Sequence, residues 1–208
     1  WFLDGVFLNY NSSYLKLALE QMLDEADSSE VTRFLRAVDV RIDGFRVEKA
    51  PEGRSQRVLV RHNVDGSDYE LRLSEESAGT QKLMGLATFL LAALERGGTV
   101  VVDELDAKLH PKLLRYVILL FKDPEVNKNG AQLIFSSQDV STMRNDVFRR
   151  DEIWFAARGE GEASQLWSLA DIHEANGNLV SKNAAFDKQY LSGRYGADPY
   201  LTRIEEWD

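Results

Sequence analysis

The most constraining feature of the sequence is a short β-branched run, Thr99–Val102, that lies between two helical patterns. The mostly apolar residues 81–96 predict a helix that stops at Gly97-Gly98. A run that is short and apolar throughout is typical of a parallel strand buried on both faces. A helix over residues 111–121 and a strand over residues 132–136 repeat this order. The alternation predicts an α/β core with a mainly parallel sheet flanked by helices.

The residues before this core follow other patterns. Apolar side chains at three- and four-residue spacing predict amphipathic helices over residues 14–26 and 30–38, the second after a Ser28-Ser29 start. Alternation over residues 57–73, interrupted by turn-forming residues, predicts a β-hairpin. Residues 50–56 are rich in Pro, Gly, Ser and charge, and they predict a loop.

The residues after the core predict a helical stretch over residues 142–148 and strands over residues 153–157 and 165–168. We therefore expect residues 1–74 to form a helical segment and hairpin that precede the core. Residues 75–208 are expected to form the core lobe with a C-terminal extension.

Composition excludes some classes of site. The 208 residues include no cysteine, which removes disulfides and thiolate metal sites and suits a reducing cytoplasm. The net charge of −9 argues against a uniformly basic nucleic-acid clamp, although a local patch or a partner subunit could still contact DNA. No apolar run is long enough to predict a membrane span. The opening Trp1–Asp4 lacks an initiator Met and the pattern of a secretory signal, and we interpret the sequence as a fragment or a processed piece. We expect the protein to be cytoplasmic.

Two adjacent carboxylates, Asp103 and Glu104, follow the apolar strand. Side chains at the carboxyl end of a parallel strand emerge beside the crevice where α/β proteins bind ligands. In phosphoryl transfer, the first carboxylate can hold Mg²⁺ while the second orients or deprotonates the attacking water. The alternative is that the two acids are simply solvated, because apolar strands often end in acidic residues.

Small residues open the helix upstream of that strand, in the segment Glu76–Lys82. Exposed backbone N–H groups and the positive end of a helix dipole favour anion binding there, and the Ser77 hydroxyl can add a donor. The alternative is an ordinary capped helix start, since serine is common at the N-cap.

The order and spacing of these two segments resemble the signature and Walker B region of ABC- and SMC-type ATPase heads. Ser77, Ala78 and Gly79 match the Ser-Gly-Gly of the signature, with alanine in place of the first glycine. By the same resemblance, Asp103 matches the Walker B magnesium aspartate and Glu104 matches the catalytic glutamate.

Three further segments extend the resemblance. Asp106–Pro111 occupies the D-loop position, and its Leu-His-Pro is similar to that of the AAA/ABC-like proteins related to the OLD nucleases. Residues 133–139 fall where the family has a strand that leads to the switch histidine, but Gln138 stands in place of that histidine. Residues 190–201 resemble the closing motif of bacterial ATP-binding proteins, several of which serve in abortive infection or other phage defence.

The resemblance implies the C-terminal lobe of an ABC-type P-loop NTPase head that uses ATP and Mg²⁺. It also implies a homodimer, with ATP held between the Walker loops of one subunit and the signature of the other. Glu104 and Gln138 would then be the catalytic residues, and Asp103 the metal ligand. The implied nucleotide-binding residues are Ser77, Ala78, Gly79, Thr80, Asp103 and His110. For His110, a capping role before Pro111 is an equal alternative.

The sequence departs from the family pattern in two ways. No Gly-x-x-x-x-Gly-Lys-Ser/Thr occurs, so we expect an N-terminal Walker A lobe to supply the phosphate loop and this chain alone to be inactive. Gln138 can hydrogen-bond a γ-phosphate or a water but cannot become an imidazolium, so we expect either slow hydrolysis or a site that mainly senses nucleotide. The alternative is that Gln138 is a solvated loop residue. A slow site favours a rival function, a non-enzymatic nucleotide sensor that restrains a toxin or nuclease partner. A nucleic-acid-binding module with a degenerate ATPase core is a further rival, which Glu104 and the acidic balance disfavour.

Several other residues are expected to be structural. His62 and His173 have no acidic or histidine neighbour at zinc-ligand spacing, and they are interpreted as surface or packing residues. Trp154 and Trp167 fall in strand-like segments and are expected to fill the core. The Arg149-Arg150 pair is too short to indicate nucleic-acid binding by itself.

Overall fold

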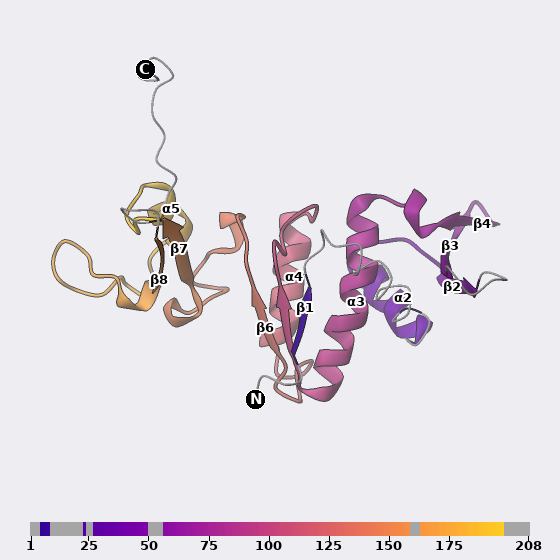
Figure 1. The fold of residues 1–208 in the computed structure, drawn as a ribbon, viewed down its shortest axis with the longest axis horizontal. Coiled ribbons are helices and arrows are strands. Elements are labelled where there is room, and N and C mark those ends of the chain that lie inside the picture. The colour runs from indigo at the N-terminus through magenta and orange to yellow at the C-terminus, as the bar shows by residue number, and fades with distance from the viewer. Residues whose placement is uncertain (1–4, 9–22, 24–26, 50–55, 159–162, 198–208) are drawn as a thin grey trace, which may run out of the picture. The chain divides into compact units, whose positions relative to one another are not determined.

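The computed structural model describes residues 5–8, 23, 27–49, 56–158 and 163–197 (Figure 1). The chain divides into two compact units, residues 1–138 and residues 139–208. The expected division between residues 74 and 75 stays a prediction. Within the described residues, every helix is too short or too polar to cross a membrane.

A parallel three-stranded sheet forms the centre of the first unit. Its strands are β1 (Gly5–Leu8), β5 (Thr99–Val102) and β6 (Gln132–Phe135), in the order β1-β5-β6 (Figure 1). Both neighbours run parallel to β5, whose Val100 and Val102 side chains are buried. The α/β class and the strands predicted at 99–102 and 132–136 are confirmed. Because the strands are parallel, their carboxyl ends meet at one edge.

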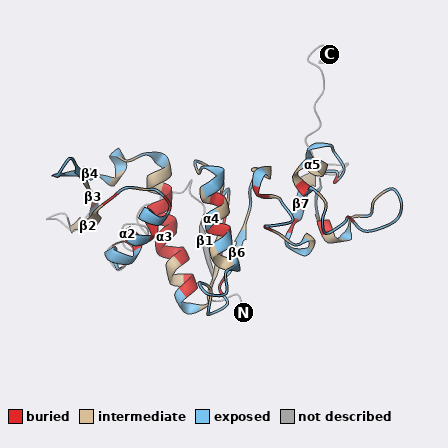
Figure 2. Cartoon of the chain, turned by 180° about the vertical axis from the view of Figure 1, so that it is seen from behind, coloured by how far each residue is buried: buried red, intermediate tan, exposed pale blue. Residues whose placement is uncertain are grey.

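Two helices flank this sheet. Helix α3 (Ala78–Arg96) contacts β5, and buried residues line much of its length (Figure 2). It begins three residues before the predicted start and ends, as predicted, where Gly97 adopts a left-handed conformation. Helix α4 (Pro111–Lys122) contacts β6 and has proline in its first turn, as predicted.

Helix α2 (Ser28–Ala37) packs on α3 through its apolar face, which includes the buried Val31 and Leu35. The helix predicted over residues 30–38 is therefore confirmed, although its N-cap is Asp27 rather than a serine. The Asp27 carboxylate accepts a hydrogen bond from the backbone N–H of Ser29 at 2.8 Å. The helix predicted over residues 14–26 lies outside the described residues except for Leu23, which is helical and buried.

An antiparallel sheet accompanies these helices. Strands β3 (Gln56–Val64) and β4 (Ser67–Arg72) form the predicted hairpin. The prediction was incomplete, because β3 also pairs with β2 (Gly44–Lys49), which gives a three-stranded sheet. Gln56, predicted to end a loop, instead opens β3, and residues 50–55 lie outside the described part of the chain.

The second unit contains an antiparallel hairpin of β7 (Trp154–Arg158) and β8 (Ser164–Ser168), followed by α5 (Phe186–Leu191). Both strands agree with the prediction to within a residue. The helical stretch predicted over residues 142–148 is wrong, because the chain forms a 3-10 turn over Val140–Thr142 and then a single turn in which the N–H groups of Val147 and Phe148 bond to the Arg144 carbonyl. The Asp139 carboxylate caps this 3-10 turn by accepting from the N–H of Ser141 at 2.6 Å, and a local bond of this kind favours a turn over a longer helix.

Aromatic side chains form the core of the second unit. The Phe155 ring stacks on Tyr190 with centroids 5.7 Å apart, and it lies 5.3 Å from Tyr195 and 6.2 Å from Trp167. The expectation for Trp167 is confirmed. That for Trp154 is wrong, since this side chain is 58% exposed. Neighbouring side chains on a strand point to opposite faces, and on β7 the buried face is occupied by Phe155.

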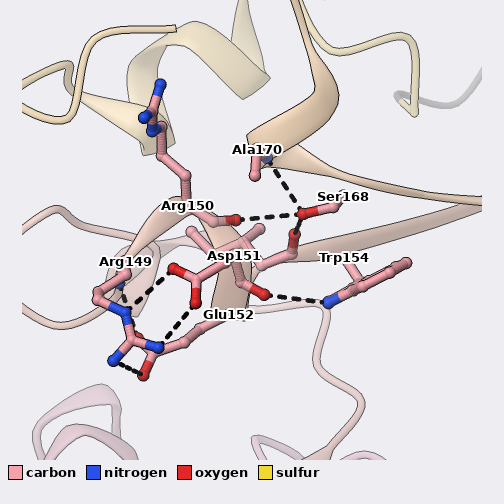
Figure 3. Close-up of polar contacts among 8 residues, drawn as sticks. Arg149, Arg150, Asp151, Glu152, Trp154, Ser168 and Ala170 are labelled. Atoms are coloured by element: carbon pink, nitrogen blue, oxygen red, sulfur yellow. Dashed lines mark hydrogen bonds and ion pairs between the residues drawn. The ribbon is translucent and has the colours of Figure 1, made fainter. Parts of the chain in front are cut away.

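A polar turn precedes β7 (Figure 3). The Arg149 guanidinium pairs with Asp151 at 2.7 Å and with Glu152 at 3.4 Å, and Arg150 donates to the Val180 carbonyl. The Ser168 hydroxyl accepts from the N–H of Ala170 at 3.1 Å. Both arginines therefore make contacts within the chain.

Candidate nucleotide-hydrolysis site

Asp103 and Ser136 lie at the edge where the carboxyl ends of β5 and β6 meet. The Ser136 hydroxyl donates to Oδ1 of Asp103 at 2.5 Å and accepts from the backbone N–H of Glu104 at 2.8 Å. Two backbone bonds hold Ser136 itself, one from its N–H to the Val102 carbonyl and one from the N–H of Leu105 to its own carbonyl, each 3.0 Å long. The serine therefore fixes both acidic residues relative to the sheet, and sequence reasoning had given it no role.

Glu104 adopts a left-handed backbone conformation with a φ of +49°. This conformation is uncommon for a residue with a Cβ atom and costs roughly 1–2 kcal/mol relative to the right-handed region. The Glu104 side chain is exposed, so no burial of apolar surface offsets that cost. Backbone strain of this kind is often found at functional sites.

The signature segment begins α3. The Ser77 hydroxyl accepts from the N–H of Thr80 at 3.1 Å and lies 2.9 Å from the Thr80 hydroxyl, so Ser77 is the N-cap of the helix. Ala78 is exposed. A Cβ atom at Gly79 would lie 3.0 Å from the carbonyl oxygen of Lys108, so glycine allows the helix start to approach the D-loop backbone closely. Contact of these residues with a nucleotide stays a prediction.

Lys82 joins the signature helix to the segment after Asp103. Its Nζ donates to the carbonyl oxygens of Glu104, Leu105 and Ala107 at 2.7, 3.0 and 2.8 Å. Burial lowers the pKa of Lys82 to about 8, while the Asp106 and Glu104 carboxylates act in the opposite direction. Sequence reasoning gave this residue no role. The sequence did contain one indication that Lys82 is buried, because this lysine directly precedes the mostly apolar residues 83–90.

The D-loop and the segment after β6 meet at the same edge. The backbone N–H of Gln138 donates to Oδ1 of Asp106 at 3.3 Å, and the Gln138 side chain is exposed. His110 caps α4, since its Nδ1 accepts from the N–H of Lys112 at 3.1 Å. Catalytic or nucleotide-binding roles for Gln138 and His110 stay predictions.

His62 has a partner that its sequence neighbours did not reveal. Its Nε2 lies 2.6 Å from Oε1 of Glu76, with the two side chains 22% and 10% exposed, and its Nδ1 lies 3.1 Å from the Arg41 carbonyl. It is thus a partly buried, hydrogen-bonded residue that connects β3 to the residue before Ser77. His173 is exposed, with Nδ1 3.1 Å from the Asp171 carbonyl. In the part of the chain that the structure describes, no group of three or more His, Cys, Asp or Glu residues could hold a metal ion.

This arrangement of a parallel sheet with clustered acids and a glycine-containing helix start at one edge is that of a nucleotide-binding ATPase domain. Residues 3–144 match the family described as "AAA domain, putative AbiEii toxin, Type IV TA system". The match covers more than half of the chain, and the chain belongs to this AAA-domain ATPase family. The resemblance to ABC/SMC-like P-loop ATPases is therefore confirmed.

No curated protein matches the chain. Among solved structures, it is similar to one from the structural biochemistry of ATP-driven dimerization and DNA-stimulated activation of SMC ATPases. The TM-score is 0.44 at 13% identity, over 76% of this chain and 89% of the other. This likeness is too weak to support an argument, so the assignment to the AAA-domain family rests on the family match over residues 3–144.

Proposed function

We propose that this chain supplies the hydrolytic carboxylates of an ATPase, with Asp103 as magnesium ligand and Glu104 as the group that orients or deprotonates the attacking water. One observation carries the proposal: the Ser136 hydroxyl bonds to the Asp103 carboxylate and to the Glu104 N–H, at the carboxyl end of the middle strand. This bridge fixes the backbone of Glu104 while its side chain remains exposed. A metal-binding carboxylate beside a water-positioning residue recurs in phosphoryl transfer.

The residues present suit Mg²⁺. Mg²⁺ in ATPase sites is usually held by one or two carboxylates together with substrate phosphates and waters. The bond from Ser136 engages Oδ1 of Asp103 and orients the carboxylate from which the ion would take its protein ligand. When bound, Mg²⁺ supplies charge neutralisation at the phosphates.

A second part of the proposal concerns the composite site. The sequence has no Gly-x-x-x-x-Gly-Lys-Ser/Thr, so we assign the phosphate loop to an N-terminal Walker A lobe and call the two together the complete ATPase. ATP then lies between two copies of the complete ATPase in a homodimer. Asp103, Glu104 and Gln138 serve the nucleotide of their own subunit. The residues that contact the partner's nucleotide are Ser77, Ala78, Gly79, Thr80 and His110.

The biological setting is proposed on narrower grounds. The resemblance of residues 190–201 to a phage-defence closing motif supports a bacterial phage-defence or DNA-related system, as does the toxin–antitoxin wording of the family description. The alternative function is a non-enzymatic nucleotide sensor that restrains a toxin or nuclease partner. It is favoured by Gln138, whose amide cannot carry the positive charge of an imidazolium.

The substitution Glu104→Gln in the complete ATPase tests the proposal. Glutamine keeps the shape but removes the carboxylate, so we expect ATP binding to be retained and turnover to fall by about 100-fold or more. The trapped nucleotide should also stabilise the closed dimer. Glu125→Gln is the matched control, because Glu125 is exposed and lies in the turn after α4.

Turnover by Glu104→Gln at the wild-type rate would overturn the hydrolytic role. A wild-type protein that binds ATP and dimerises without any Glu104-dependent hydrolysis would instead support the nucleotide sensor.

A further inference from the structure

Lys82 is the one charged side chain in the buried class among the residues that the structure describes, at 6% exposure. Placing an ammonium in a protein interior is unfavourable unless its donors find acceptors. The ammonium has three N–H donors, and three backbone carbonyls lie within 3.0 Å of it. The lysine is therefore satisfied as a cation by backbone oxygens.

These carbonyls come from one irregular segment, Glu104–Lys108, that follows the hydrolytic strand. Two of its residues, Glu104 and Lys108, have left-handed backbones, with φ of +49° and +64°. Left-handed residues other than glycine persist where surrounding contacts determine the conformation. The convergence of three carbonyl dipoles on one point is itself unfavourable without a positive charge between them. Lys82 supplies that charge.

The same segment also contacts the start of α3. A Cβ atom at Gly79 would lie 3.0 Å from the Lys108 carbonyl, so the first turn of the helix lies directly against this backbone. Lys82 is on the next turn of the helix and donates to the carbonyls of Glu104, Leu105 and Ala107 in this segment. Together these contacts attach the backbone of Glu104 to the helix that begins with Ser77.

We propose that Lys82 is a positioning residue that holds Glu104 in its hydrolytic orientation and ties it to the signature helix. This inference rests on the proposed function, since it assigns Lys82 a role through Glu104. A movement of α3 on contact with the partner's nucleotide would then be transmitted to the water-orienting group of its own site.

The test uses the complete ATPase with Lys82→Met, Lys82→Gln and, as control, Lys128→Met, since Lys128 is an exposed lysine of the same unit. Methionine keeps the length of the stem and removes the charge. Misplacing a reacting group by a small distance can reduce turnover by about 100-fold, so we expect kcat of Lys82→Met to fall by about 10- to 100-fold. KM for ATP should change by less than about threefold, because the Lys82 ammonium bonds backbone carbonyls of residues 104, 105 and 107 and is assigned no part in nucleotide binding.

A second readout does not depend on activity. Amide hydrogen exchange should become faster in residues 104–109 of Lys82→Met, where the N–H groups of Ala107 and Leu109 bond within the segment, and stay unchanged in α4. Lys82→Gln retains amide donors and should show a smaller version of both effects. If Lys82→Met fails to fold, Lys82→Gln carries the same comparison.

The outcomes separate the two proposals. Loss of turnover in Glu104→Gln together with wild-type kcat in the folded Lys82 variants would overturn the role of Lys82 alone. Wild-type turnover in Glu104→Gln would overturn the proposed function and this inference with it. Equal acceleration of exchange throughout the unit would reduce Lys82 to a general stabilising residue and also overturn the inference.

Discussion

A residue with a left-handed backbone lies at each end of strand β5, but the residue type differs: Gly97 precedes the strand and Glu104 follows it. At the end that joins α3 to β5, Gly97 takes the left-handed conformation at a φ of +77°, and the Asn129 amide donates to the carbonyls of Leu94 and Glu95 at 3.1 and 2.7 Å. At the other end of β5, Glu104 takes the left-handed conformation and the Lys82 ammonium bonds the carbonyls.

The difference lies in which residue has the positive φ. Glycine adopts that conformation without steric cost, so the Gly97 end is relaxed. Glu104 has a Cβ atom and an exposed carboxylate, so the opposite end retains strain and presents a reactive group. The turn at Gly97 therefore serves only to connect α3 to β5, which we call the folding end. The turn at Glu104 presents a carboxylate at the candidate site, and we call it the functional end.

The largest expected effect is at the functional end. In the complete ATPase, Ser77→Arg should abolish ATP-driven dimerisation, because a bulky cation would occupy the partner's γ-phosphate site. Loss of the α3 cap should cost only about 1 kcal/mol of stability. Sedimentation with and without ATP measures dimerisation, and thermal melting measures the cap.

The matched control is Asp27→Ala, which removes the cap of α2. It should lose about as much stability and keep dimerisation. Equal dimerisation by Ser77→Arg and wild type would leave Ser77 as a cap only. Mixing Ser77→Arg subunits with subunits that lack the phosphate-loop lysine should restore partial activity, since one composite site then contains neither change.

At the folding end, Gly97→Ala should destabilise the protein by about 3 kcal/mol. An added Cβ would lie 2.3 Å from the Asn129 carbonyl oxygen, and the backbone would remain left-handed. Gly66→Ala isolates the backbone contribution, because Gly66 has a φ of +82° with nothing within 4 Å of an added Cβ. We expect about 1 kcal/mol for Gly66→Ala, by urea denaturation. Similar losses at the two glycines would contradict the close contact at Gly97.

A pH dependence of stability is also expected at Lys82. Burial lowers its pKa to about 8 in the folded protein, whereas an unfolded lysine titrates near its ordinary value of about 10.4. Between these values the unfolded chain binds more protons, so the contribution of Lys82 to stability rises with pH. The free energy of unfolding of wild type minus that of Lys82→Met should therefore increase from pH 8 to pH 10. A flat difference would mean that the pKa is not lowered.

Local patterns were sufficient for much of the fold. Strand β5 and helices α3 and α4 were predicted because the residues that specify each of them are neighbours in the sequence. These residues are the apolar positions of the element and the residues that begin or end it. Strand β2 was missed although Phe45 and Val47 alternate with charged residues, because the run is short and its partner strand begins only at Gln56.

The carboxylates of the candidate site followed from sequence, but the groups that hold them did not. Asp103 and Glu104 were recognised from the end of an apolar strand. The bonds from Ser136 and Lys82 join segments 33 and 22 residues away, and they exist only once the sheet and α3 have formed. The left-handed backbone of Glu104 likewise depends on those contacts and has no signature in its own residue type.

The most direct test of the contrast compares Glu104→Gly with Glu104→Ala in the complete ATPase, by free energy of unfolding and single-turnover hydrolysis. Both variants should lose hydrolysis. If Glu104 is strained, glycine should be the more stable variant by about 1 kcal/mol, because only alanine retains the cost of a left-handed Cβ. At an ordinary position the order is reversed, with alanine the more stable. An alanine variant that is more stable than the glycine variant, or a glycine variant that still hydrolyses ATP, would contradict the account.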